Sequence, residues 1–324
     1  MPEEIHKLVA EVLARKDLHA SESLYEKVLI ESNGTQLILP EDADQRRALI
    51  GEYITKHLHA FKVVLLRDGT REILDGENCP SLAKSMRVYV TPTGITIAAG
   101  THIGPKRSTN ADRVIVHTGA DFAAAIDGIG SSMNGGVRAA QLLAEAEQEN
   151  PIIQRKTVNE ASLAMAGKNM PSGEGACHAS ARIAIDHKGR RWLIPNHTGD
   201  SRILVARNKS EIFSTRDETV TKALIEQGIL DPKLEKTHKL RNMITSHISS
   251  GYTKVTTDKP IELQSGDTVC IGTDCIFNCL TNKEIASIIG DLPVSEAFHK
   301  LAEAMEKSAT PSNDNRSLVL MRIP

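Results

Sequence analysis

The stretch that most constrains this chain is the apolar run from Phe122 to Ile126, which ends abruptly at Asp127-Gly128-Ile129-Gly130. An apolar run followed by two glycines predicts a buried β-strand that stops at a turn. Glycine lets a backbone approach a ligand closely, and the aspartate places a carboxylate at the edge of the predicted sheet. Taken alone, Asp-Gly is first of all a turn signal. The tetrapeptide is therefore a candidate metal site only if other carboxylates join it.

Three further aspartates lie beside apolar runs. They are Asp112 before Val114–Val116, Asp274 after Val269–Ile271, and Asp314 before Leu318–Met321. Four aspartates at predicted strand ends form a candidate carboxylate cluster. Two carboxylates about 4 Å apart repel by roughly 4 kcal/mol at an effective dielectric constant of 20, so such a cluster needs a bound cation or raised pKa values. Hard oxygen ligands favour Mg²⁺ or Mn²⁺ over zinc.

Composition describes an ordinary water-soluble protein. With 40% hydrophobic residues but only 3% aromatic ones, the chain of 324 residues predicts a large and mainly aliphatic core. A net charge of −2 gives no reason to expect binding to nucleic acid or to an anionic membrane. The start, Met1-Pro2-Glu3-Glu4, does not resemble a signal peptide, and no apolar run approaches the roughly 20 residues that span a bilayer. We expect a cytoplasmic location.

Cysteine and histidine spacings show no metal motif. The five cysteines form no C-x-x-C pair and predict reduced thiols, and the i, i+4 spacing of Cys275 and Cys279 is typical of packed side chains on a helix. The twelve histidines contain no H-x-x-x-H or H-E-x-x-H pair, so we expect surface positions for them.

Residues 1–85 predict a mainly helical N-terminal extension. Apolar spacing indicates helices over 3–16, 22–30 and 40–59, followed by a hairpin of Phe61–Leu66 with Arg71–Leu74. No catalytic constellation is visible there. We expect an appendage that packs on the main domain or on a protein partner.

Residues 86–324 predict a single domain of short strands and helices. We expect strands at 88–90, 95–98, 114–117, 122–126, 181–185, 191–195, 203–207 and 318–321, and helices at 137–150, 158–166, 218–227, 283–289 and 294–307. This order favours an α+β protein with antiparallel sheets.

Ordered motifs in this region resemble the protein phosphatase 2C family of metal-dependent serine/threonine phosphatases, in particular its bacterial members. Asp127-Gly128-Ile129-Gly130 is similar to the family's D-G-x-G. The other matching segments are Gly104–Asp112, Asn196–Arg202, Gly266-Asp267 with Thr273-Asp274, Asp314–Leu320, and the stretches Leu224–Gly228 and His238–Thr245. Their order along the chain carries the resemblance.

The resemblance implies a four-layer α-β-β-α sandwich of two antiparallel sheets with two Mn²⁺ or Mg²⁺ ions at one end. It implies that the ions activate a water for hydrolysis of phosphoserine or phosphothreonine in a phosphoprotein. By the family's pattern, Asp127 bridges the ions, Gly128 offers its carbonyl, and Asp274 and Asp314 bind one ion. Asp112 acts beside them, partly through waters, and Arg107 binds the substrate phosphate. The pattern gives no chemical role to Asp200 and Arg202, which we interpret as structural.

Five positions depart from the family's pattern. Ile129 replaces a histidine of eukaryotic members, Ser131 a glycine, Ala111 the glutamate that often precedes the first-motif aspartate, and Cys275 the glycine after the Ser-Asp pair. Ser172 stands where bacterial members often carry a third-metal aspartate, which leaves a third ion in question. An inactive pseudophosphatase that binds a phosphoprotein, or a signalling module whose phosphatase domain is regulated by a partner, therefore stay open as alternatives to an active enzyme.

Overall fold

The computed structural model describes residues 28–32, 35–37, 62–65, 69–76, 78–130, 136–149, 166–186, 188–308 and 314–324. In the N-terminal part, β1 (Val28–Ser32) pairs antiparallel with both β2 (Thr35–Leu37) and β3 (Lys62–Leu65). The helix predicted over 22–30 is therefore wrong at its end, where β1 begins. The helices predicted over 3–16 and 40–59 lie outside the described residues.

The predicted hairpin of Phe61–Leu66 with Arg71–Leu74 is also wrong. Both strands exist, but β3 pairs with β1, whereas β4 (Arg71–Leu74) pairs with β7 (Asp112–His117). The turn signal at Asp68-Gly69-Thr70 could not identify the strand partners. Pairing partners depend on contacts distant in sequence, which local patterns do not encode.

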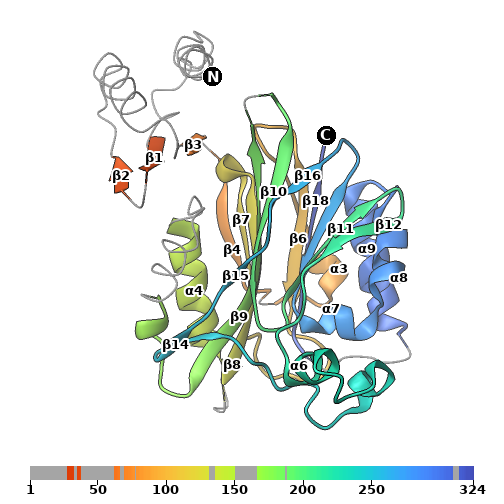
Figure 1. The fold of residues 1–324 in the computed structure, drawn as a ribbon. Coiled ribbons are helices and arrows are strands. Elements are labelled where there is room, and N and C mark those ends of the chain that lie inside the picture. Colours follow the sequence, from red (N-terminus) through yellow and green to blue (C-terminus); the bar gives the residue numbers. More distant parts are fainter. Residues whose placement is uncertain are drawn as a thin grey trace.

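Two antiparallel sheets lie face to face in the centre of the molecule (Figure 1). In the first sheet the order is β14-β13-β9-β8-β7-β4, and β10 pairs with β9, β15 and β16. Its further strands are β8 (Phe122–Gly130), β9 (Glu174–Ile185), β10 (Arg191–Thr198), β13 (Ile248–Ser249), β14 (Tyr252–Thr253), β15 (Thr256–Thr257) and β16 (Ile261–Leu263).

The second sheet has the order β12-β11-β17-β18-β6-β5. Its strands are β5 (Arg87–Val90), β6 (Thr96–His102), β11 (Arg202–Arg207), β12 (Ser210–Ser214), β17 (Thr268–Gly272) and β18 (Arg316–Arg322). Every strand pair described in either sheet is antiparallel.

Helices cover the outer faces, which gives the predicted four-layer order (Figure 1). α4 (Val137–Glu149) lies on the first sheet, and α3 (Leu82–Ser85), α7 (Asp274–Cys279), α8 (Asn282–Ile289) and α9 (Val294–Glu306) lie on the second. α6 (Val220–Glu226) and the short 3-10 helix η3 (Pro232–Thr237) belong to an excursion between β12 and β13. A one-turn 3-10 helix, η2 (Thr118–Ala120), joins β7 to β8. No helix in the described part of the chain is long and apolar enough to cross a membrane.

Each space between layers holds its own hydrophobic cluster, and the middle one fixes the orientation of the site. Between the sheets, alternate residues such as Ala123 and Ala125 of β8 and Val114 and Val116 of β7 are buried, while Ile115 packs on the other face under α4. The period of two along a strand produces this division. Many inward positions are alanine, valine or isoleucine, which confirms the predicted aliphatic core.

β4 and α3 belong to the sandwich, although the predicted domain boundary at residues 85 and 86 separates them from it. Leu74 of β4 is buried between the sheets, and Leu82 of α3 is buried under α9. The phenol of Tyr89 in β5 also donates to Glu72 of β4, at 2.6 Å. The contacts therefore support a domain that begins before residue 71.

Candidate metal and phosphate site

Asp112 and Asp127 meet at one end of the first sheet. Asp112 is the first residue of β7, and it lies directly opposite Asp127 in the β7–β8 register. Alternate residues of a strand face the same side of the sheet. Asp112 lies two residues from Val114, and Asp127 two residues from Ala125, so both carboxylates face the space between the sheets. The strand alternation thus directs two acidic side chains into the end of the inter-sheet core.

The second sheet supplies the other two predicted aspartates. Asp274 is the first residue of α7, immediately after β17, and Asp314 comes just before β18. β17 and β18 are neighbours in the sheet, so the two segments reach the same end of the sandwich. The structure therefore brings Asp112, Asp127, Asp274 and Asp314 to one place, although they are far apart in sequence.

Burial and mutual repulsion raise the pKa values of Asp112, Asp127 and Asp274. The pKa of Asp127 lies well above its usual value because the side chain is buried, and because Asp112, Asp274, Asp200 and Asp314 add negative charge. Burial is again the main cause for Asp274. For Asp112, burial raises the pKa to about 7, although hydroxyl groups partly oppose the shift.

Asp200, which we interpreted as structural, lies close enough to the cluster to act on it electrostatically. It lies in the turn between β10 and β11, and its charge raises the pKa of both Asp127 and Asp274. Its own pKa is raised to about 6, mainly by burial and then by Asp217. Asp200 follows a strand, β10, just as Asp274 follows β17, but the family's pattern gave it no chemical role.

Asp112 and Asp274 are each held by side chains next to the cluster. Asp112 Oδ2 accepts hydrogen bonds from the hydroxyls of Thr273 at 3.0 Å and Ser317 at 2.7 Å. Asp274 Oδ2 accepts from Asn278 at 2.9 Å. With these partners in place, no three His, Cys, Asp or Glu side chains of the described residues are arranged to hold a metal ion. The chemistry of the donor set, five clustered carboxylates, nevertheless fits a hard divalent cation.

Arg107 lies at the rim of the cluster. Its Nε and Nη2 donate to the two carboxylate oxygens of Asp314 at 2.8 and 2.6 Å, and its side chain is 56% exposed. Hydrogen bonding to Asp314 is the main cause of its raised pKa, and the charges of Asp127 and Asp274 contribute. The structure thus places the predicted phosphate ligand beside the predicted metal ligands.

Asn315 and two glycines hold the loops of the site together. Asn315 Oδ1 accepts from the backbone of Ala111, and its Nδ2 donates to the carbonyls of Ile103 and Thr109, which fastens the Arg107 loop to β18. A Cβ at Gly128 would lie 2.3 Å from the carbonyl oxygen of Gly136. Gly128 is therefore required for close packing against the backbone of Gly136, whereas the sequence predicted close approach of a ligand.

The departures from the family pattern fall at different distances from the cluster. The side chain of Cys275 is buried in the hydrophobic cluster between the second sheet and its helices, and Cys279 packs there too, as predicted. All five cysteines are free thiols. Ser172 is exposed in the turn before β9, and Ser131 lies outside the described residues.

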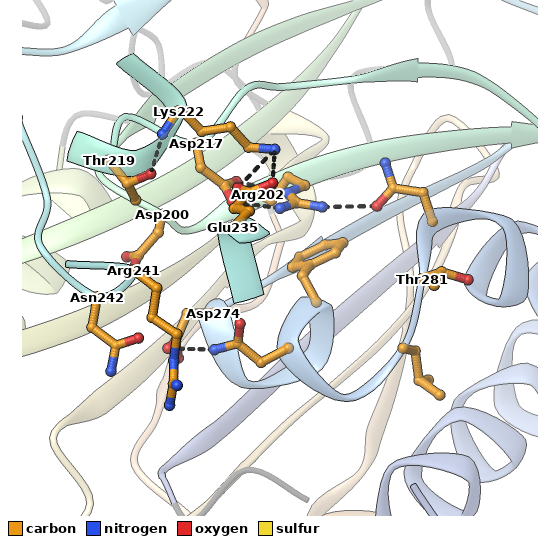
Figure 2. A pocket seen from close by; sticks show the side chains of 14 residues that line it. Asp200, Arg202, Asp217, Thr219, Lys222, Glu235, Arg241, Asn242, Asp274 and Thr281 are labelled. Atoms are coloured by element: carbon orange, nitrogen blue, oxygen red, sulfur yellow. Dashed lines mark hydrogen bonds and ion pairs between the residues drawn. The ribbon is translucent and has the colours of Figure 1, made fainter. Parts of the chain in front are cut away.

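A pocket of about 190 Å³ adjoins the cluster (Figure 2). Asp200 and Asp274 line it on the side of the cluster, and Arg241 and Asn242 line it from the excursion that carries α6. Arg202 also lines the pocket and forms an ion pair with Asp217. Its guanidinium carbon lies 4.5 Å from the ring centroid of Phe277. The pocket provides a concave surface next to the carboxylates.

Comparison with known proteins agrees with this geometry. The protein phosphatase PhpP of Streptococcus pneumoniae is 27% identical over 126 residues, which cover 39% of this chain and 51% of PhpP. The serine/threonine protein phosphatase PstP of Mycobacterium tuberculosis is 26% identical over 227 residues, 67% of this chain and 43% of PstP. Both relatives are protein phosphatases, so the sequence comparison agrees with the resemblance to bacterial protein phosphatase 2C-type enzymes.

The solved structures support the same fold. The catalytic domain of PstP, crystallised with two manganese ions, has a TM-score of 0.58 and 22% identity, covering 71% of this chain and 99% of that domain. At this identity the likeness shows the fold alone. The chain spans about half the length of the curated relatives, and no family model matches it.

Proposed function

We propose that the chain is a metal-dependent phosphatase that hydrolyses phosphoserine and phosphothreonine in proteins. The observation that carries the proposal is the convergence of five carboxylates at one end of the sandwich, with Arg107 at their rim. Burying several carboxylates together is costly unless protons or cations neutralise them. The relatives that share this arrangement of segments are protein phosphatases by name, and one was crystallised with two manganese ions.

The residues that would hold two Mn²⁺ or Mg²⁺ ions are those of the cluster. Asp127 would serve both ions, with the carbonyl of Gly128 beside it, and Asp274 and Asp314 would bind one of them. Asp112 would act partly through waters, and we add Asp200 as a further acidic residue of the cluster on electrostatic grounds. When bound, the ions would supply a water activated for attack and would neutralise the charge of the phosphoryl group.

Arg107 would bind the substrate phosphate. Its guanidinium group already makes a two-pronged contact with the carboxylate of Asp314, and phosphate oxygens present the same geometry. Arg107 would therefore have to leave Asp314, which would also free that carboxylate for a metal ion. The pocket lined by Arg241 and Asn242 would accommodate protein segments beside the phosphorylated residue. Such a reaction is typical of signalling, and we expect a cytoplasmic location.

A pseudophosphatase is less well supported by the geometry than an active enzyme. Cys275, one of the departures that motivated the alternative, directs its side chain into the hydrophobic core. It therefore leaves the carboxylate of Asp274 unobstructed.

Hydrolysis of a small aryl phosphate with and without Mn²⁺ tests the proposal. The wild-type chain should turn over substrate only with Mn²⁺, and calorimetry should detect binding of the metal. Asp127→Asn keeps the shape of the side chain but removes its charge, so Mn²⁺ affinity and turnover should both fall by orders of magnitude. Binding of Mn²⁺ without turnover in the wild type would favour the pseudophosphatase, and no binding would reject the site.

A further inference from the structure

Four rows of the core between the sheets end in polar side chains at the site. Thr101 continues the row of Ile97 and Ala99 on β6, and Ser317 continues the row of Val319 and Met321 on β18. Asp112 and Thr273 complete the set, and all four side chains are at most 1% exposed. Buried polar groups at the end of an apolar core are costly unless they satisfy one another.

These groups form a continuous hydrogen-bond network. The hydroxyls of Thr273 and Ser317 both meet Oδ2 of Asp112, and Ser317 also contacts the hydroxyl of Thr101 at 2.8 Å. Asn110 Nδ2 donates to Thr101 at 3.0 Å. Each hydroxyl carries one proton, and an ionised carboxylate can only accept. The hydroxyl of Ser317 is placed to donate to Oδ2 of Asp112 and to the hydroxyl of Thr101.

The hydroxyl of Thr273 bonds Asp112 in place of the interaction that its position in the chain would favour. Thr273 is the N-cap residue of α7, yet its side chain makes no capping hydrogen bond. In contrast, Thr219 and Thr281 cap α6 and α8 with their hydroxyls. A capping threonine stabilises the start of a helix. Thr273 forgoes that interaction and donates to Asp112 from the other sheet.

The network connects the segments that carry the candidate ligands. Thr273 immediately precedes Asp274, and Ser317 follows Asp314 by three residues. The backbone of Ser317 donates to the Thr273 hydroxyl, and the backbone of Thr273 donates to the Ser317 carbonyl, each at 3.3 Å. Through two hydroxyls, the carboxylate of the first sheet is thus fastened to the two acidic segments of the second.

We propose that Thr273 and Ser317 are positioning residues that hold Asp112 by one oxygen and set its spacing from Asp274 and Asp314 for divalent-metal binding. Because both hydroxyls occupy Oδ2, Oδ1 is the oxygen left for the metal site. This inference rests on the proposed function. Substituting the partners that orient metal ligands typically weakens metal affinity about 10- to 100-fold.

Matched variants separate positioning from packing. Thr273→Val and Ser317→Ala remove the hydroxyls, whereas Thr273→Ser and Ser317→Thr retain them. Thr268→Val is the control for loss of a buried hydroxyl, because Thr268 is equally buried on β17 but donates to the carbonyl of Ile289. Mn²⁺ dissociation constants are measured by calorimetry on each full-length variant, next to thermal unfolding in metal-free buffer and aryl phosphate turnover.

Thr273→Val and Ser317→Ala should each raise the Mn²⁺ dissociation constant at least tenfold, with Thr273→Ser close to the wild type. Thr268→Val should lower the melting temperature without changing Mn²⁺ affinity. If folded Thr273→Val and Ser317→Ala bind Mn²⁺ like the wild type, the inference is overturned, whatever their turnover. Wild-type Mn²⁺ binding without turnover would instead reject the proposed function alone. Absence of binding in the wild type would overturn both.

Discussion

Arg107 and Asp314 form an ion pair in the structure. The proposed function gives each of them a different ligand, the substrate phosphate for Arg107 and a metal ion for Asp314. Their two hydrogen bonds hold Asp314 in a position where it serves the guanidinium group. An exposed ion pair contributes about 1 kcal/mol or less, so a divalent cation can displace it. The pair therefore couples metal binding to the release of Arg107.

This coupling predicts opposite effects of Arg107→Ala on two ligands. Mn²⁺ should bind more tightly, by up to about fivefold, because Asp314 loses its competing partner. The KM for a phosphopeptide should rise strongly, because the phosphate loses its two-pronged donor. Calorimetry with Mn²⁺ and steady-state kinetics measure the two effects. Arg107→Lys, which keeps the charge without the fork, should recover little of the phosphate affinity. Unchanged phosphopeptide kinetics would remove Arg107 from the site.

The buried His117 leads to a prediction for the stability of the protein in acid. It is fully buried on β7, and burial, assisted by the charge of Arg71, lowers its pKa to about 4 from an ordinary value of 6.5. Between these values the unfolded chain binds a proton that the folded chain does not. His117 therefore makes the folded state less stable as the pH falls from 6.5 towards 4, by up to about 1.4 kcal/mol per pH unit.

His117→Leu should flatten this acid dependence while keeping the fold. The free energy of unfolding from urea titrations at several pH values between 4 and 7 measures the slope. An identical slope in the variant and the wild type would assign the acid sensitivity to other groups.

At this scale, sequence identified the aspartates well and buried polar residues badly. Asp112, Asp127, Asp274 and Asp314 were predictable because each lies where an apolar run ends, and strand ends in a sandwich gather at its edges. The expectation that histidines lie at the surface is wrong for the buried His117, His178 and His197. Their partners come from other segments, as in the contact of His178 with Glu147 on α4, and no local pattern reveals such a contact.

Among the elements, the loop before β7 depends most on a single side chain. Asn315 makes three hydrogen bonds to this loop, and it is almost fully buried. Asn315→Ala should reduce the free energy of unfolding by about 3 kcal/mol, because buried backbone groups lose their partners. The KM for phosphate substrates should rise as well, because Arg107 lies in the same loop.

Urea unfolding and amide hydrogen exchange across residues 103–111 measure these two consequences. Exchange that stays slow in Asn315→Ala would show that the loop is held by other contacts.

Long, strongly patterned elements were predictable, and short ones were not. The strands near 114–117, 122–126 and 203–207 and the helices near 283–289 and 294–307 are confirmed, usually within a few residues. β13, β14 and β15 contain two residues each, and a periodic pattern needs more than that. These short strands exist because neighbouring strands offer hydrogen-bond partners, so only the assembled sheet specifies them.

At the scale of the whole molecule, the sandwich is built so that its two sheets meet through small aliphatic side chains. Ala99, Ala123, Ala125, Ala179 and Ala181 all lie in the core between them. At the end of this core, the hydroxyls of Thr273 and Ser317 from one sheet reach Asp112 of the other. The alanine-rich core and the polar network at its end are thus parts of the same arrangement, and the site depends on an intact sandwich.

The last prediction concerns where this sandwich begins. A chain starting at residue 69 retains β4 and α3, so it should fold and should hydrolyse an aryl phosphate in Mn²⁺ like the full chain. A chain starting at residue 86 loses Leu74 and Leu82, each buried in the core and worth about 2–5 kcal/mol. It also loses the carbonyl of Asp75 that accepts from Asn110, next to the Asp112 network.

Because whole domains are stable by only about 5–15 kcal/mol, the shorter chain should aggregate or unfold at room temperature. Size-exclusion chromatography and thermal unfolding of the two chains, prepared side by side, distinguish them. If the chain starting at residue 86 folds as well as the other, the domain boundary lies where the sequence predicted it. If the chain starting at residue 69 also fails to fold, the preceding residues are part of the structural core and not an appendage.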